Sequence, residues 1–204
     1  HMDDAFAVGR SQSTEAKTAM VMLTTVTTIK KFLTHMIKNF QKIKDLKAAA
    51  NAVHFVPKGK ANLEVPLDAM ELLIQDCLVY FHPDEGETDE EKQQSERLQR
   101  CQQDLFQAEG IVDLLLKVID KLTVYTATQH LQYLHKDQVE RLEVLLVNVY
   151  KLLAGIIKKN RANCAKFSKN LDWLIGQLDA RQNASAGILA VLSAVLDDST
   201  EVLN

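Results

Sequence analysis

Glycine, proline and aromatic residues are all scarce in this chain of 204 residues. It has 7 glycines and 3 prolines, and aromatics make up 6% of it, whereas apolar residues as a whole reach 47%. Few turn-forming and aromatic residues beside many aliphatic ones are typical of a helical protein rather than a β-rich one. A chain of this length can bury a core of its own. We therefore expect a single all-α domain over residues 1–204 that needs no cofactor to stay folded.

The chain also lacks a marked excess of charge of either sign. It carries 24 basic and 27 acidic residues, a formal net charge of −3. Such a balance produces no general field that would attract nucleic acid or an anionic membrane. The most apolar stretch, residues 139–157, is interrupted by charged and amide side chains, and no basic and then apolar leader opens the sequence. We expect no nucleic-acid binding, no membrane insertion and no secretion.

The chain has only three cysteines, an odd number. Cys77, Cys101 and Cys164 are far apart in the sequence, and each falls at an apolar position of a helical pattern. Free cysteines in such positions are usually buried, and unpaired thiols indicate a reducing compartment. All three are predicted to be buried free thiols.

The first third of the chain shows a strong helical period. Apolar residues recur every three or four positions from Met22 to Ile43, which predicts one long helix over residues 11–46. This period outweighs the run of β-branched residues at 23–29, which by itself favours a strand. Residues 47–65 contain a glycine and a proline among mixed polar residues and are predicted to form a flexible loop.

Two helix starts follow in which a carboxylate lies three residues after a capping side chain. Asp68 with Glu71 predicts a capping box for a helix over residues 66–82, and Thr88 with Glu91 predicts one for the next helix. The polar residues of the first of these helices form a narrow stripe, so we expect it to be central. In the second, residues 89–97 have no apolar face and should be exposed. The apolar side chains that follow are predicted to pack inside: Leu98, Cys101, Leu105 and Phe106.

Further helices are expected over residues 111–122, near 131–134, over 139–159, as a bent or double helix after 160, and over 188–196. Residues 139–159 have the thinnest polar edge and should form the most deeply buried helix. Leu146 and Trp173 are predicted core residues. Seven or eight helices without a strict repeat predict an armadillo-like helical bundle.

Residue patterns that carry chemistry are mostly absent. No two histidines are four residues apart, as a zinc site on one helix face would require, and neither a glycine-rich phosphate loop nor a nucleophile elbow occurs. The acidic run at residues 84–91 does not match a calcium-binding loop, because Gly86 and Thr88 would occupy ligand positions and Ser95 that of the closing carboxylate. We predict no catalytic residue, no metal site, no cofactor and no enzymatic activity.

Two groups of charged residues remain as candidate sites. Lys158, Lys159 and Arg161 form the main basic concentration and could hold a phosphate, although lysines also commonly cap the carboxyl end of a helix. Charged residues that flank helix ends are candidates for contacts between domains. The residues of this second group are Arg10, Asp84, Glu85, Glu87 and Asp89.

Several stretches of the chain resemble one family. They are His1–Ala5, Glu90–Gln93, Gln103–Gly110, Asp120–Leu122 with Val124 and Tyr125, Asn160–Cys164, Asn170–Leu174, and Gly187–Leu189 through to Glu201–Asn204. The set resembles the helical segment near the N-terminus of ryanodine receptors, within the homology domain that those channels share with inositol trisphosphate receptors. The similarity extends over nearly the whole chain, is weak over residues 16–66, and is most specific at Asn160–Cys164 and Asn170–Leu174.

The resemblance implies a homotetrameric calcium-release channel of the endoplasmic or sarcoplasmic reticulum. In that family the cytosolic N-terminal region has two β-trefoil domains followed by a helical third domain, which this chain would represent. The domain would lie on the cytosolic face of the membrane and have a mechanical role. Its contacts with neighbouring domains and with adjacent subunits would couple movements of the cytosolic assembly to a distant pore.

The resemblance leaves a second branch to consider, because inositol trisphosphate receptors use the corresponding domain to bind ligand phosphates. Asp104 and Gln107 fall where that branch carries Lys and Arg, and Ile157 falls where it carries Tyr, although Lys158 and Lys159 keep the adjacent basic pair. An acidic residue facing a phosphate is repulsive, which favours the ryanodine branch. Phosphate binding by Lys158, Lys159 and Arg161 and an unrelated armadillo-type adaptor stay open as alternatives.

Overall fold

The computed structural model describes residues 17, 20–35, 37–38, 67–81, 88–126, 136–180 and 184–200. Predictions made for Arg10, the 47–65 loop, Asp84 to Glu87 and the short helix near 131–134 lie outside these residues. Residues 20–35 are helical. The helices that follow are α2 (Leu67–Tyr80), α3 (Asp89–Ala108), α4 (Ile111–Thr126), α6 (Lys136–Ile157), α7 (Arg161–Phe167), the 3₁₀ helix η1 (Ser168–Asn170), α8 (Leu171–Ala180) and α9 (Ser185–Thr200). No described residue lies in a strand, so the all-α prediction is confirmed.

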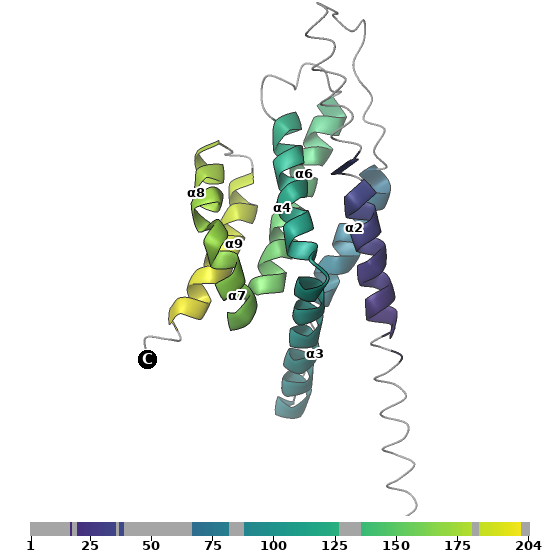
Figure 1. Cartoon of the computed structure of the whole chain (residues 1–204), viewed down its shortest axis with the longest axis vertical. Coiled ribbons are helices and arrows are strands. Elements are labelled where there is room, and N and C mark those ends of the chain that lie inside the picture. Colours follow the sequence, from purple (N-terminus) through teal and green to yellow (C-terminus); the bar gives the residue numbers. More distant parts are fainter. Residues whose placement is uncertain are drawn as a thin grey trace, which may run out of the picture.

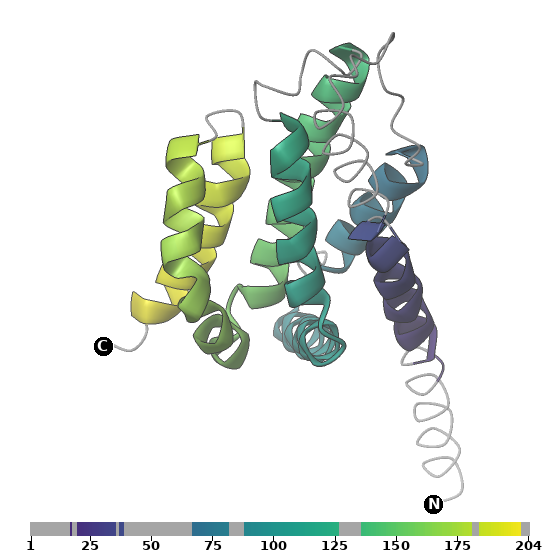
Figure 2. The same cartoon turned by 45° about the horizontal axis from the view of Figure 1, so that its top comes forward.

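The helices are arranged in three layers. The pair α4 and α6 lies in the middle, with α2 and the helix of residues 20–35 on one side and α8 with α9 on the other (Figures 1 and 2). Helix α6 packs against α2, α4 and α9 and so contributes to every layer boundary. Helices α3 and α7 lie across one end of the layers (Figure 2). The described helices thus form an all-α bundle of stacked layers.

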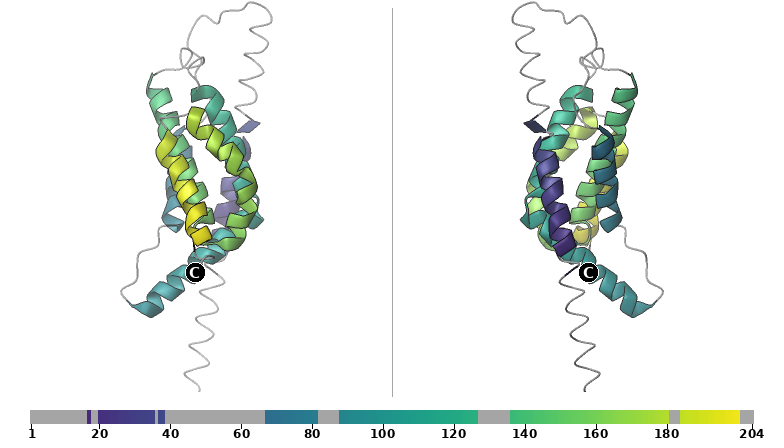
Figure 3. Two further views of the ribbon diagram at one scale, coloured as in Figure 1. Left: turned by 90° about the vertical axis from the view of Figure 1, so that its left-hand side faces the viewer. Right: turned by 90° about the vertical axis from the view of Figure 1, so that its right-hand side faces the viewer.

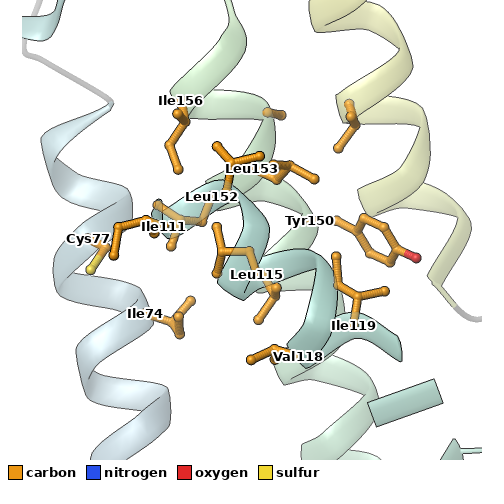
Figure 4. Packing of buried hydrophobic residues seen from close by; sticks show 14 of the residues in the cluster. Ile74, Cys77, Ile111, Leu115, Val118, Ile119, Tyr150, Leu152, Leu153 and Ile156 are labelled. Atoms are coloured by element: carbon orange, nitrogen blue, oxygen red, sulfur yellow. The ribbon is translucent and has the colours of Figure 1, made fainter. Parts of the chain in front are cut away.

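The core is built around α6, as its sequence predicts. Most of its apolar side chains between Leu142 and Ile157 are buried, because α2, α4 and α9 pack around this helix. Figure 4 shows the side chains of three helices meeting there. They are Ile74 and Cys77 from α2, Ile111, Leu115, Val118 and Ile119 from α4, and Tyr150, Leu152, Leu153 and Ile156 from α6.

Helix α2 is peripheral, and the prediction that it is central was wrong. One face, including Met70 and Ile74, is buried against α6, but Leu72 is 61% and Val79 is 71% exposed on the opposite side. A narrow polar stripe shows where water is tolerated; it does not require the remaining apolar surface to be covered, since much of any protein surface is apolar.

The predicted capping box of α2 was also wrong. Asp68 is the second residue of the helix, and its carboxylate binds the Arg141 guanidinium. Glu71 accepts from Arg141 Nε at 2.9 Å and from Nη2 at 2.9 Å, so the two carboxylates tie α2 to α6. These hydrogen bonds, first with Glu71 and then with Asp68, raise the pKa of Arg141. The same spacing that caps a helix therefore serves a bidentate ion pair here.

Helix α3 begins as predicted. Thr88 Oγ1 accepts a hydrogen bond from Glu91 N at 3.2 Å, and Thr88 N donates to Glu91 Oε2 at 3.1 Å, which completes a capping box. The side chains of residues 89–97 are exposed apart from half-buried Ser95. Figure 3 shows these first turns projecting away from the other helices.

The inner face of α3 differs from the one that its apolar residues predict. Leu98 is 45% exposed and Cys101 is exposed, whereas Gln102 and Gln103 are buried beside Phe106. Two glutamines thus replace two apolar residues in the interface. The burial of Gln103 depends on hydrogen-bond partners that the end of α6 supplies.

Candidate functional site

The most densely bonded polar cluster among the described residues lies where α3 crosses the end of α6 and the start of α7. It consists of Gln103, Asn160 and Asn163, which we call the amide junction. These three side chains are 2%, 1% and 2% exposed. The last four carbonyls of a helix have no partner within it, and a buried amide side chain can supply the missing donors.

Amide side chains from α3 and α7 donate hydrogen bonds to the backbone carbonyls at the end of α6. Gln103 Nε2 donates to Gly155 O and to Lys158 O, each at 2.8 Å. Asn163 Nδ2 donates to Ile156 O at 3.0 Å and to Gln103 O at 3.2 Å. The end of α6 is therefore capped by side chains from α3 and α7.

Asn160 joins the same three elements. It is the N-cap of α7, where its Oδ1 accepts from Asn163 N at 3.1 Å. Its Nδ2 donates to Gln103 Oε1 at 3.2 Å and to Asp104 Oδ1 at 2.9 Å. The Asn-x-x-Asn spacing of the Asn160–Cys164 motif thus has a local explanation as a helix cap. No local sequence pattern indicated that Gln103 would complete the cluster.

The basic residues of the predicted phosphate site lie beside this junction: Lys158 and Lys159 in the turn after α6, and Arg161 at the first position of α7. Lys158, Lys159 and Arg161 are all exposed, and Lys159 has a φ of 54°, in the left-handed region. Arg100 Nη2 donates to Lys159 O at 2.9 Å, which holds the turn from the side of α3. The three exposed cations therefore lie where α6 ends and α7 begins.

The other residues that the sequence analysis named, Asp89, Asp104 and Ile157, do not form a site with these cations. Asp89 is exposed at the first position of α3. Asp104 is bonded to Asn160 at the junction, and Ile157 is fully buried. Among the described residues no three His, Cys, Asp or Glu side chains are grouped as metal ligands. A crevice among Met22, Tyr80 and Phe106 has no room for a water molecule.

The amide junction itself contains no ionisable group, so its three members cannot transfer protons under ordinary conditions. It can fix the angle between α3 and α6. Helix α3 is held to the end of α6 by directional hydrogen bonds on buried groups, which are costly to break. Its physical role is that of a rigid joint between the projecting helix and the core.

The thiols fall into two classes, which corrects the prediction that all three are buried. Cys77 and Cys164 are buried, whereas Cys101 is exposed. Cys101 follows the apolar period of α3, but the neighbouring glutamines occupy the interface. Burial, with a smaller contribution from the charge of Asp76, raises the pKa of Cys77 to about 12.

We expect Cys101 to react with iodoacetamide at pH 8 and Cys77 to stay unmodified in the folded chain. At that pH, a thiol with a pKa of about 12 is roughly one part in ten thousand thiolate, the reactive form. Peptide mass spectrometry after timed alkylation would measure both rates. Equal labelling of Cys77 and Cys101 without denaturant would contradict the assignment, and both should react fully in urea.

None of the helices described here combines the length and the hydropathy needed to cross a membrane. A family model for the RIH domain matches residues 71–204, which include most of α2, the whole amide junction and the last helix. The match covers well over half of the chain. The chain therefore belongs to the RIH domain family, which ryanodine and inositol trisphosphate receptors share.

Proposed function

We propose that this domain is a cytosolic N-terminal structural and allosteric module of an intracellular calcium-release channel. Membership of the RIH family is the observation that carries this proposal. The RIH domain of channel receptors is not an enzyme family. Residues 1–204 would form the third domain of the channel's N-terminal region, on the cytosolic face of the endoplasmic or sarcoplasmic reticulum. Its partners would be neighbouring domains and the adjacent subunits of a homotetramer.

The way the helices are joined supports a mechanical role. The projecting half of α3 offers exposed side chains, Asp89 among them, to a neighbouring domain. The amide junction connects α3 to α6, and α6 packs on α2, α4 and α9. A displacement of α3 would therefore be passed to the core helix without bending a flexible connection. Transmission through packed, rigid elements is how small shifts become large ones in switching proteins.

The proposal is tested in the full-length channel by single-channel recording. We expect Asp89→Lys to change the open probability and to leave the unitary conductance unchanged, because a contact far from the pore biases gating without altering the permeation path. Lys117→Glu, which reverses an exposed charge on α4, serves as a matched control and is expected to have a smaller effect. An altered conductance, or an open probability unchanged by Asp89→Lys, would contradict the proposal.

Binding of an inositol phosphate is the second candidate function. It is favoured by the exposure of Lys158, Lys159 and Arg161 where α6 ends and α7 begins. Two features oppose it: the Asp104 carboxylate lies at the adjoining junction, where it would repel a phosphate, and buried Ile157 offers no hydroxyl to a ligand.

Calorimetry with inositol trisphosphate distinguishes the two functions. We expect no heat of binding at micromolar ligand. A saturable micromolar signal that disappears in Lys158→Gln with Lys159→Gln would instead establish the phosphate-binding reading. The third alternative, an adaptor unrelated to these channels, does not agree with the family match.

A further inference from the structure

A row of exposed cations runs from the end of α6 through α7 to η1. It consists of Lys158, Lys159, Arg161, Lys166 and Lys169, which we call the basic ridge. The sequence from residue 158 to residue 171 contains no aspartate or glutamate. On α4, by contrast, Asp113 and Lys117 alternate in sign one turn apart. The ridge is therefore a local positive patch on a chain whose formal net charge is −3.

The buried side of α7 fixes the direction in which the ridge faces. Asn163, Cys164 and Phe167 are buried, and Cys164 Sγ donates to Val195 O of α9 at 3.6 Å. The amide junction bonds the start of the same helix to α3 and α6. Because these contacts occupy one side of α7, the exposed cations lie on the other side and point away from the core. Figure 2 shows α7 at one end of the layers, beside α3.

The charge of the ridge is not neutralised by ion pairs. None of its five members forms one within the part of the chain that the structure describes. Two carboxylates border the ridge: Asp104 of α3 accepts a hydrogen bond from Asn160, and Asp172 follows in the first turn of α8. Exposed Arg100 of α3, which donates to Lys159 O, adds a further cation at the same end. Like charges along a helix repel one another, so a partner of opposite charge would be stabilising.

The shape of the ridge selects among the anions that could bind it. From Arg161 to Lys169 the chain advances about 12 Å at 1.5 Å per residue, so these cations do not converge on one phosphate group. The exposed side chains between them are Ala162, Ala165 and Ser168. Membrane-surface helices use large apolar anchors, and single-stranded nucleic acids are bound by stacking on aromatic rings. A row of carboxylates on a polypeptide fits this surface better than either of these.

We propose that the basic ridge is a docking surface for an acidic segment of a neighbouring polypeptide. Carboxylates spaced three or four residues apart on that segment would face Arg161, Lys166 and Lys169. A single exposed ion pair contributes little, so recognition depends on several pairs that form together. The amide junction holds α7 in one orientation, so the cations are positioned before the partner arrives.

The partner rests on the proposed function, since it would be a neighbouring domain or an adjacent subunit of the same channel. The docking surface deepens that function by naming the face of the domain that makes the contact. The two can fail separately. Channel recording with Asp89→Lys reports on α3 and gating, whereas the experiment below uses the isolated chain and reports on binding at α7 and η1.

The probe is a synthetic helical peptide of roughly five turns with glutamates three or four residues apart on one face and alanine and glutamine elsewhere. A second peptide of the same composition, with the glutamates distributed around the helix, is the matched control. In fluorescence anisotropy titrations we expect the one-faced peptide to bind the chain about tenfold more tightly than the control. Raising the salt concentration from about 50 to about 300 mM should weaken this binding about tenfold, because exposed charges are screened.

Charge reversal on α7 and η1 separates the ridge from the general field of the protein. Lys166→Glu combined with Lys169→Glu should lower the affinity for the one-faced peptide about tenfold and leave the melting temperature unchanged, because both side chains are exposed. Lys117→Glu combined with Lys151→Glu alters the net charge equally on α4 and α6, and should lower the affinity no more than about twofold. Amide chemical-shift changes should centre on α7 and η1.

The docking surface would be overturned by equal affinity for the two peptides, by equal losses in the two double variants, or by shift changes on another face. Stronger binding of inositol hexakisphosphate, or of vesicles with equal parts of phosphatidylcholine and phosphatidylserine, would also overturn it if that binding depends on Lys166 and Lys169. The ligand would then be a phosphate group. Sedimentation that shows self-association through the same two lysines would make a second copy of the chain the occupant instead.

Discussion

Replacing Leu146 with alanine is expected to lower the free energy of unfolding by about 2–5 kcal/mol. Leu146 lies on α6, is 2% exposed and belongs to the buried cluster that joins the layers. The truncation removes transfer free energy and leaves a cavity that rigid neighbouring helices cannot fill. Urea denaturation followed by circular dichroism measures the loss.

Val144→Ala is the matched control for Leu146→Ala. Val144 lies two residues earlier on α6 but is 59% exposed, so its truncation should change stability by no more than about 0.5 kcal/mol. Equal denaturation midpoints for Leu146→Ala and the wild-type chain would mean that Leu146 does not lie in the hydrophobic core.

Replacing Gln103 with methionine is expected to cost roughly 3 kcal/mol or more. Methionine keeps most of the volume but removes the donor to Gly155 O and Lys158 O and the acceptor for Asn160 Nδ2. Each buried polar group left without a partner costs about 1–3 kcal/mol. The effect should appear in urea denaturation, and amide hydrogen exchange should show faster opening of α3 and α7 than of the middle of α6.

Gln94→Met provides the comparison for Gln103→Met, since Gln94 is exposed on the projecting half of the same helix. It should leave stability within about 0.5 kcal/mol of the wild-type value. A loss from Gln103→Met no larger than that from Gln94→Met would show that the amide junction does not hold α3 in place.

Trp173 lies at the edge of the core. It was predicted from the sequence to be a core residue, but it is only partly buried against the core, and its indole Nε1 donates to Asp120 Oδ1 at 3.2 Å. It therefore bridges α8 and α4 near the surface. The helical period identifies apolar positions but does not tell whether a large ring reaches the centre of the core or lies at its edge.

Local patterns in the sequence determined the helical class, the buried course of α6 and the capping box at Thr88. These features depend on residues within one or two helical turns of each other. The spacing of apolar and capping side chains along the sequence therefore predicts them. The family resemblance was also detectable in short motifs such as Asn160–Cys164. The family match over residues 71–204 confirmed it.

Tertiary structure alone decided which apolar and polar surfaces are covered. Leu72 and Cys101 follow helical periods yet are exposed, while Gln103 is buried because Asn160 and Asn163 lie more than fifty residues away in sequence and next to it in space. Burial of a polar group depends on partners that the fold brings together, and no local pattern encodes their positions.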